Sequence, residues 1–331
     1  MAQQNDKAQI SRSTCIYLAG HTGLVGGAVL RALHARGYDH VLVRSHAELD
    51  LTDQAQTRAF FSAEHAELVI LAAARVGGIL ANWEYPYEFV RENLAIELNV
   101  IHEAFRSGVK RLVFLGSSCI YPKLAAQPLK EEYLLTGPLE ETNRPYAIAK
   151  IAGIELCRSL NREHGMQYLS LMPSNLYGPG DNFDLETSHL LPALLRRFHE
   201  ARQTAIKPGA ATGGTSPVIL WGTGTPRREL LHVDDLAAAV CLLLEMDDWT
   251  GVADGLLNVG TGKDTTIAEL AGLVANVVGY KGSVEWDTSK PDGTPRKVLD
   301  VARIRELGWQ PRIGLEEGIR RTYDWYLEGL G

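Results

Sequence analysis

The sequence predicts an α/β protein with a doubly wound parallel sheet and a smaller C-terminal lobe. Apolar segments alternate with amphipathic helical segments over the first half of the chain, a glycine-rich turn follows the first apolar segment, and the texture changes after about residue 180. Such alternation is typical of a Rossmann-type sheet with helices on both faces. We divide the chain into a disordered tail over 1–13, a sheet domain over 14–180 and a second lobe over 181–331, with some later segments returning to the sheet.

The elements follow from the period of their apolar residues. Continuous apolar runs predict buried strands over 14–20, 41–44, 68–74, 111–118 and 168–178. A helical period predicts helices over 25–36, 53–63, 86–107 and 144–164, and in the second half over 234–245, 265–278 and 315–328. The segment 202–217 is rich in Gly, Thr and Pro and predicts a long loop.

Composition excludes several classes of protein. The 331 residues are 45% hydrophobic and carry a formal net charge of −7, which argues against a general nucleic-acid binder. No apolar run approaches the ~20 residues of a membrane span, and the polar N-terminus does not read as a signal peptide. We expect a cytoplasmic protein with neither metal site nor disulfide, because no CxxC pair occurs among Cys15, Cys119, Cys157 and Cys241.

A GxxGxxG turn joins the first predicted strand to the first predicted helix. Glycines let the backbone turn tightly and approach a pyrophosphate, which then lies at the positive N-terminus of the helix. An ordinary strand–helix turn is the alternative, and the position at the start of the sheet favours a dinucleotide site. The residues expected to bind the cofactor here are Gly20, His21, Thr22, Gly23, Leu24, Val25 and Gly26.

The end of the second strand decides which dinucleotide is expected. NAD-binding sheets usually carry an acidic residue there for the ribose 2′-hydroxyl, whereas this chain has Arg44 and His46. A guanidinium can hold a 2′-phosphate with two hydrogen bonds, so we expect NADPH, with a solvated surface arginine as the alternative. After the third strand, Leu71, Ala72 and Ala73 form a wall of mostly small residues beside the expected cofactor.

The segment Tyr146-Ala-Ile-Ala-Lys150 puts a phenol and an ammonium one helical turn apart. This spacing suits a tyrosine that gives a proton to a carbonyl while a lysine lowers its pKa and holds the nicotinamide ribose. We assign Ser117 as the hydroxyl that polarises the keto group, with Ser118 as the second candidate and helix capping as the structural alternative. The same strand end supplies expected cofactor contacts from Leu115, Gly116, Ser117 and Ser118.

Longer strings resemble the GDP-L-fucose synthase family of extended short-chain dehydrogenases over nearly the whole chain. They are GSSCIYPK (116–123), PYAIAKIAG (145–153), PSNLYGPGDNF (173–183), HLLPALLRRFHEA (189–201), WGTGTPRREL (221–230), LHVDDLA (231–237) and PDGTPRK (291–297). The resemblance implies a homodimer that converts GDP-4-keto-6-deoxy-D-mannose to GDP-L-fucose. The family epimerises C3 and C5 of the sugar and then reduces C4 with NADPH.

The resemblance also gives roles to a thiol and an imidazole. It implies that Cys119 is the base of epimerisation and that His189 is the acid and a cofactor contact. Without it, Cys119 would be read as a small buried hydrophobe and His189 as a surface residue. Sugar 4,6-dehydratases carry an Asp–Glu pair where this chain has Ser118 and Cys119, which argues against a dehydratase.

Further contacts come from the same resemblance. It places Asp50 and Leu51 at the adenine ring. The strand end expected to line the nicotinamide comprises Pro173, Ser174, Asn175 and Leu176. The residues expected to bind the GDP-sugar are Arg197, Trp221, Arg228, Asp292 and Lys297, three of them as cations for the diphosphate.

The sequence departs from the family pattern at two positions. The family often has arginine where Thr22 and His46 stand, so selectivity for NADPH would rest mainly on Arg44. An NAD-dependent nucleotide-sugar 4-epimerase is the alternative enzyme. A non-catalytic dinucleotide-binding protein is a third hypothesis, which Tyr146 and Lys150 disfavour.

Overall fold

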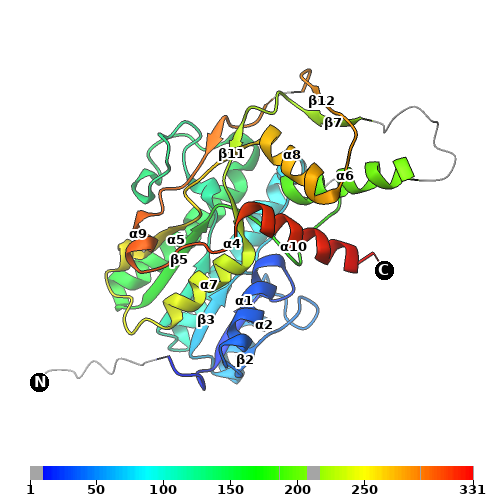
Figure 1. The fold of residues 1–331 in the computed structure, drawn as a ribbon. Coiled ribbons are helices and arrows are strands. Elements are labelled where there is room, and N and C mark those ends of the chain that lie inside the picture. The colour runs from blue at the N-terminus through cyan, green and yellow to red at the C-terminus, as the bar shows by residue number, and fades with distance from the viewer. Residues whose placement is uncertain (1–9, 186, 207–216, 291, 331) are drawn as a thin grey trace, which may run out of the picture.

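Six parallel strands form the central sheet of the larger lobe (Figure 1). They stand in the order β10-β5-β4-β3-β1-β2, and all five neighbouring pairs are parallel. This arrangement confirms the predicted fold class. The strands are β1 (Ile16–Ala19), β2 (Val41–Leu42), β3 (Leu68–Leu71), β4 (Arg111–Leu115), β5 (Gln167–Pro173) and β10 (Leu256–Val259).

The computed structural model describes residues 10–185, 187–206, 217–290 and 292–330. Residues 1–9 of the predicted tail and 207–216 of the predicted loop lie outside the described residues. Ile10 already packs against the core, and Arg12 forms an ion pair with Glu245 at 3.0 Å, so the folded part begins before residue 14. The described part contains no helix that is long and apolar enough to cross a bilayer.

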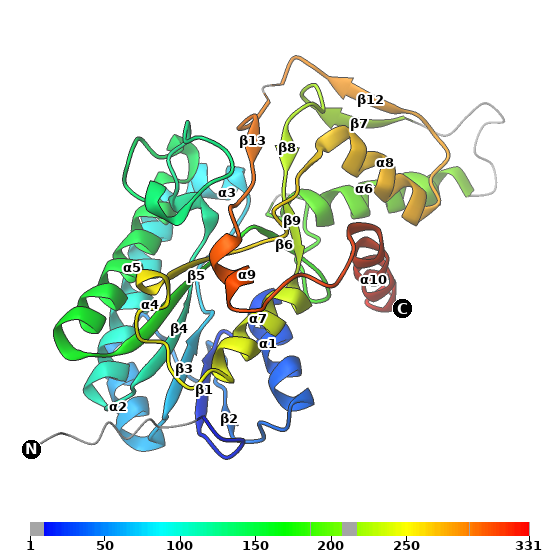
Figure 2. The same cartoon turned by 60° about the vertical axis from the view of Figure 1, so that its left-hand side comes forward.

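Helices cover both faces of the sheet because each buries one apolar stripe on strands that are apolar on both sides. Figure 2 shows α2, α4 and α5 on one side of the sheet and α1 and α7 on the other. The helices of this lobe are α1 (Leu24–Ala35), α2 (Gln54–Glu64), α3 (Ile79–Glu84), α4 (Pro86–Arg106), α5 (Arg144–His164), α7 (Val233–Leu244) and α9 (Ala302–Glu306).

The predicted strand over 168–178 is two strands. β5 ends at Pro173, and β6 (Asn175–Tyr177) leaves the central sheet to pair in parallel with β9 (Leu230–His232). The chain turns at Ser174, whose N–H donates to the carbonyl of Val259 at the end of β10. This break carries the chain from the sheet into the second lobe.

The second lobe has its own apolar core, built from α6 (Leu190–Ile206), α8 (Ile267–Val278) and α10 (Leu315–Glu328). α6 extends to Ile206, so the predicted loop begins later than residue 202. Short strands complete the lobe in two small sheets. They are β7 (Val218–Trp221) with β12 (Val284–Asp287), and β8 (Arg227–Arg228) with β11 (Thr265–Thr266) and β13 (Arg296–Lys297).

The buried carboxylate of Glu229 forms hydrogen bonds at the junction of the two lobes. Glu229, between β8 and β9, is fully buried and accepts hydrogen bonds from the N–H groups of Gly262 at 2.7 Å and Leu299 at 2.7 Å. Each carboxylate oxygen therefore satisfies a different backbone donor. Burial raises the pKa of Glu229, and the hydrogen bonds from Leu299, Gly262 and Thr261 act in the opposite direction.

Glu229→Gln should destabilise the protein, because an amide offers one acceptor oxygen and leaves one of the two backbone N–H groups unpaired. We expect the free energy of unfolding to fall by about 1–3 kcal/mol, measured by urea denaturation. Glu285→Gln, at an exposed site on β12, is the matched control and should change nothing. An unaltered unfolding midpoint for Glu229→Gln would show that the junction does not depend on this carboxylate.

Candidate active site

In the glycine turn, the backbone at the start of α1 packs closely against the backbone at the end of β1. Gly20 has a φ of +88°, and a Cβ built on Gly26 would lie 2.0 Å from the Gly20 carbonyl oxygen. α1 begins after Gly23 with no side-chain cap and no acidic residue in its first turn, so its N–H groups are open to an anion. The buried Nδ1 of His21 has no hydrogen-bond partner among the described residues.

The predicted NADPH-selecting residues lie after β2. The Arg44 guanidinium forms an ion pair with Glu64 of α2 and donates to the carbonyl of Val43. The His46 side chain is exposed. The arginine on which 2′-phosphate recognition was predicted to rest is therefore already paired with a carboxylate.

Asp50 and Leu51 lie in the loop between β2 and α2, and the remaining predicted cofactor residues lie at strand ends or directly beyond them. Leu51 and Leu71 are buried, Asp50 accepts hydrogen bonds from Thr52, and a Cβ on Gly20 would meet the backbone nitrogen of Ala73 at 2.6 Å. The glycine turn and the wall after β3 are thus in direct contact. The other members of the set are Ala72 behind β3, Leu115, Gly116 and Ser118 at β4, and Pro173, Ser174, Asn175 and Leu176 at β5 and β6.

Tyr146 lies near the start of α5, facing the end of β4. Burial raises the pKa of Tyr146, with smaller contributions from Cys119 and Glu97, and a hydrogen bond with Ser117 acts in the opposite direction. The edge of its ring packs against Phe89 of α4, with ring centroids 6.4 Å apart. The phenol therefore keeps its proton and is in hydrogen-bonding contact with the candidate hydroxyl.

Lys150 is 1% exposed, one turn after Tyr146 on α5. Its ammonium donates to the carbonyl of Leu115 at 3.0 Å and lies 3.1 Å from a carboxylate oxygen of Glu97, which is also 1% exposed. Burial raises the pKa of Glu97 to about 7, while the Lys150 ammonium lowers it. The ammonium is thus held by a hydrogen bond to the end of β4 and by an ion pair with α4.

Cys119 lies in a short 3₁₀ helix over Ser118–Ile120, directly after β4. Ser117 accepts a hydrogen bond from the N–H of Cys119 at 3.2 Å, which fixes the turn. The Lys297 ammonium, from β13, lies 3.5 Å from the Cys119 sulfur. Lys297 was predicted to bind the diphosphate, but in the structure its described contact is with the candidate base.

His189 directly precedes α6, at the end of a loop that docks on the larger lobe. The N–H of Gly78 donates to the carbonyl of Thr187 at 3.1 Å, and Gly77 packs on Phe89, the ring beside Tyr146. His189 has exposed surface, yet the protein atoms around it lower its pKa by desolvation. The loop before His189 thus contacts the larger lobe close to Phe89.

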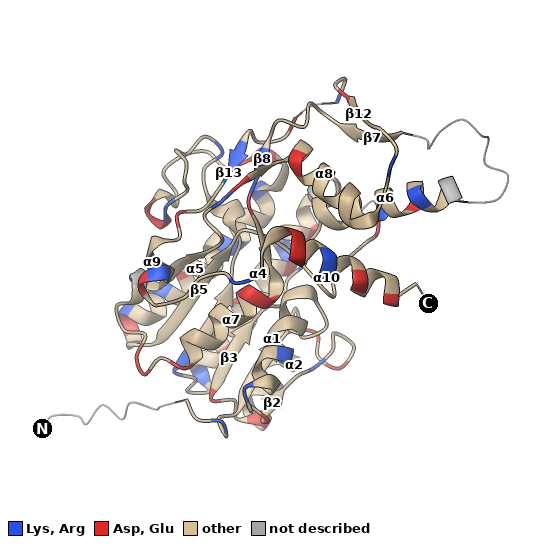
Figure 3. Ribbon diagram, viewed as in Figure 1, with Lys and Arg blue, Asp and Glu red and all other residues tan. Residues whose placement is uncertain are grey.

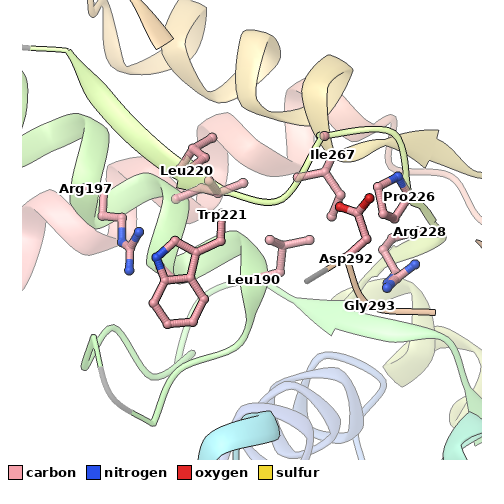
Figure 4. A pocket seen from close by; sticks show the side chains of 12 residues that line it. Leu190, Arg197, Leu220, Trp221, Pro226, Arg228, Ile267, Asp292 and Gly293 are labelled. Atoms are coloured by element: carbon pink, nitrogen blue, oxygen red, sulfur yellow. The ribbon is translucent and has the colours of Figure 1, made fainter. Parts of the chain in front are cut away.

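Four of the five predicted substrate residues line one cavity of about 210 Å³ (Figure 4). Arg197, Trp221, Arg228 and Asp292 surround it together with apolar side chains that include Leu190, the neighbour of His189. Arg197 has no hydrogen bond or ion pair with any residue the structure describes. Figure 3 shows basic residues on α6 and β8, which border this cavity, and on β13, which pairs with β8.

Arg227 and Arg296, which neighbour the predicted cations Arg228 and Lys297, form ion pairs within the lobe. Asp264 binds both Arg227, at 2.6 Å, and Arg296, so their charges are neutralised within the sheet of β8 and β13. Arg228 instead donates to the carbonyl of Thr294 at 2.6 Å and faces the cavity. Burial lowers the pKa of Arg228, against the influence of Asp292.

Sequence reasoning missed Glu97 and the contact between Lys297 and Cys119. Glu97 has a signal that could have revealed it, because it continues the buried stripe of α4 formed by Phe89, Asn93 and Ile101. A carboxylate within an apolar stripe requires a buried partner. The contact of Lys297 with Cys119 joins positions 178 residues apart and carries no local signal.

Comparisons with known proteins agree with this geometry. The family described as "NAD dependent epimerase/dehydratase family" matches residues 16–260. GDP-L-fucose synthase 1 of Arabidopsis thaliana is 53% identical, over 96% of this chain and 95% of that one, and GDP-L-fucose synthase of Escherichia coli K12 is 53% identical, over 95% and 96%. The solved GDP-mannoheptose C4 reductase of Campylobacter jejuni with NADP bound is 38% identical, with a TM-score of 0.88 over 96% and 99% of the two chains. The chain therefore belongs to the NAD dependent epimerase/dehydratase family and, within it, to the GDP-L-fucose synthase family.

Proposed function

We propose that this epimerase/reductase converts GDP-4-keto-6-deoxy-D-mannose to GDP-L-fucose. In this proposal Cys119 and His189 epimerise C3 and C5, and Tyr146, Lys150 and Ser117 serve the reduction of C4 by NADPH. The observation that carries it is the Lys297 ammonium of the second lobe 3.5 Å from the sulfur of Cys119, two residues after the Ser117 that hydrogen-bonds with Tyr146. A simple reductase has no use for a thiol beside its proton donor.

The glycine turn fits a dinucleotide. The open N-terminus of α1 suits a pyrophosphate, the glycines admit it closely, and the unpaired Nδ1 of His21 offers a further polar contact. NADPH, when bound, supplies the hydride for C4. Its preference over NADH is supported by the NADP-bound relative and by Arg44, which would have to share its charge between Glu64 and a 2′-phosphate.

The chain's own groups divide the proton chemistry. Tyr146, whose raised pKa keeps it protonated, donates to the C4 oxygen, and Ser117 polarises the same carbonyl. Cys119, whose sulfur lies 3.5 Å from the Lys297 ammonium, removes the proton beside the ketone. His189 returns a proton on the opposite face, and the negative charge of a bound GDP-sugar favours its protonated form.

The cavity fits the nucleotide end of the substrate. Arg197 and Arg228 provide cations for the diphosphate, while the exposed ring of Trp221 offers a stacking surface for the base. Asp292 is held by the N–H and hydroxyl of Thr223 and can accept from a ribose hydroxyl. The names of the relatives support guanine as the base.

The purified protein with GDP-4-keto-6-deoxy-D-mannose should oxidise NADPH and form GDP-L-fucose, followed by absorbance and by product chromatography. Tyr146→Phe should slow the reduction by roughly 10²–10⁴-fold, because no other group supplies the proton, and should leave NADPH affinity nearly unchanged. Interconversion of C4 epimers without net NADPH loss would instead indicate a nucleotide-sugar 4-epimerase.

Cys119→Ser should abolish exchange of the C3 and C5 hydrogens with solvent deuterium, because a hydroxyl is a far weaker acid than a thiol and does not form the base. Proton NMR of the keto-sugar in D₂O measures this exchange without NADPH. Cys241→Ser, at a buried site on α7, is the matched control. Exchange at the parent rate in Cys119→Ser would remove the thiol from the mechanism.

We also propose that the protein is a cytoplasmic homodimer. Four free cysteines suit a reducing compartment. Large apolar side chains that a second copy would cover are exposed on α3, α4 and α5, namely Leu80, Trp83, Tyr87, Leu94, Leu98 and Ile148.

Leu98→Glu, on the exposed side of α4, should turn the dimer into a monomer, because it would bury a charge in the interface. Light scattering coupled to size exclusion measures the mass. Leu124→Glu, in an exposed loop after Cys119, should leave the mass unchanged. A parent protein of monomeric mass would contradict the proposed assembly directly.

A further inference from the structure

We infer that Glu97 is a positioning residue that keeps the Lys150 ammonium charged and in place beside Tyr146. The inference rests on the proposed function, in which Lys150 and Tyr146 serve the reduction. It starts from the packing of α4 on α5, where two opposite charges face each other without access to water.

The polar contact of the Glu97 carboxylate among the described residues is its ion pair with Lys150. Neither of its oxygens has a hydrogen-bond partner among the described residues apart from this ion pair at 3.1 Å. A buried carboxylate with one cationic contact is unfavourable for folding when a packed apolar residue would fill the same space. Its position against the lysine of the YxxxK pair indicates a role in the site.

The protein makes room for this carboxylate. A Cβ at Gly153, one turn after Lys150, would lie 2.9 Å from the other oxygen of Glu97 and 2.6 Å from the ring of Phe114. Any larger residue at that position would push the carboxylate or the ring away. The Lys150 ammonium also lies 4.7 Å from the centroid of the Phe114 ring. The ion pair therefore lies in a small space bounded by α4, α5 and β4.

The geometry holds the ammonium between an anion and a carbonyl. The carbonyl of Leu115 accepts one of its N–H groups, the Glu97 carboxylate lies 3.1 Å away as the counter-ion, and Nζ lies 5.8 Å from the centroid of the Tyr146 ring. The attraction of Glu97 thus favours the position of the ammonium beside Tyr146. A neutral amine in the same place would lack this attraction.

The charge of Glu97 also acts on proton loss in the site. The titratable groups that face Glu97 are Lys150 and Cys157 of α5, and those that face Tyr146 are Cys119 after β4 and Glu97 itself. A negative charge makes proton loss harder for both Lys150 and Tyr146. Removing the charge of Glu97 should therefore let Lys150 and Tyr146 lose their protons at lower pH. Either loss slows the reduction.

Glu97→Gln keeps the shape and removes the charge. We expect the pH at which NADPH-dependent reduction fails on the basic side to fall by about one unit or more, a loss of about tenfold in kcat above that pH. The KM for the keto-sugar should stay unchanged, because Glu97 touches no substrate. Glu97→Asp, with its carboxylate drawn back by one methylene, should shift the profile less and in the same direction.

Glu103→Gln is the matched control. Glu103 is a second buried carboxylate on α4, 3% exposed and paired with Arg58 at 3.1 Å, away from α5. This substitution should change the free energy of unfolding at most and leave the pH dependence of the NADPH-dependent reduction unchanged. If both variants shift the profile alike, or if neither does, Glu97 is only structural and the inference is wrong.

A second measurement needs no turnover. In protein labelled with ¹³C at lysine Cε, the Lys150 resonance, assigned by its loss in Lys150→Met, should titrate at lower pH in Glu97→Gln than in the parent. Coincident titrations would overturn the inference. A parent protein that does not reduce the keto-sugar would refute the proposed function while this titration still decides the role of Glu97. Should Glu97→Gln not fold, Glu97→Asp carries both measurements.

Discussion

The buried contact between Lys150 and the two elements around it is the interaction on which the rest of the site depends. An ammonium without water needs an anion and a carbonyl, and here α4 supplies Glu97 while β4 supplies Leu115. These two contacts join α5 to α4 and to the end of β4 one helical turn after Tyr146. The proposed proton donor therefore lies next to a point where α5 is attached to both of its neighbours.

The second lobe contributes to this centre through its attachment as well as through its cavity. Glu229 ties β8 and β9 to the loops at residues 262 and 299, and Asp264 ties β8 to β13. These ties hold the strand that delivers Lys297 to Cys119. The lobe that contains the proposed nucleotide cavity thus also carries the cation beside the thiol, and these contacts connect the two parts of the proposed chemistry.

Local patterns in the sequence were enough for five of the six strands of the sheet, the helices between them and the glycine turn, whereas β10 was covered only by the expectation that later segments return to the sheet. The helix over 144–164 and the helix over 315–328 have the predicted bounds, because their apolar periods are long and their ends are marked. Tyr146 and Lys150 could be named because one helical turn separates them. The grouping of Arg197, Trp221, Arg228 and Asp292 in one cavity was accessible only through family resemblance, since they come from separate segments. Pairings across the fold, such as Glu97 with Lys150, Arg44 with Glu64 and Lys297 with Cys119, depend on tertiary contacts that no sequence period encodes.

The missing side chain at Gly153 ties three positions into one unit. The Glu97 carboxylate and the Lys150 ammonium lie together against Phe114, in space that the absence of a side chain at Gly153 leaves open. A substitution at any of these three positions therefore changes which side chains fit at the other two. A tyrosine–lysine pair grafted onto another helix would therefore arrive without its counter-ion unless the facing helix and the glycine were transplanted as well. In this scaffold, the smallest portable piece of the proposed reductive centre includes both helices.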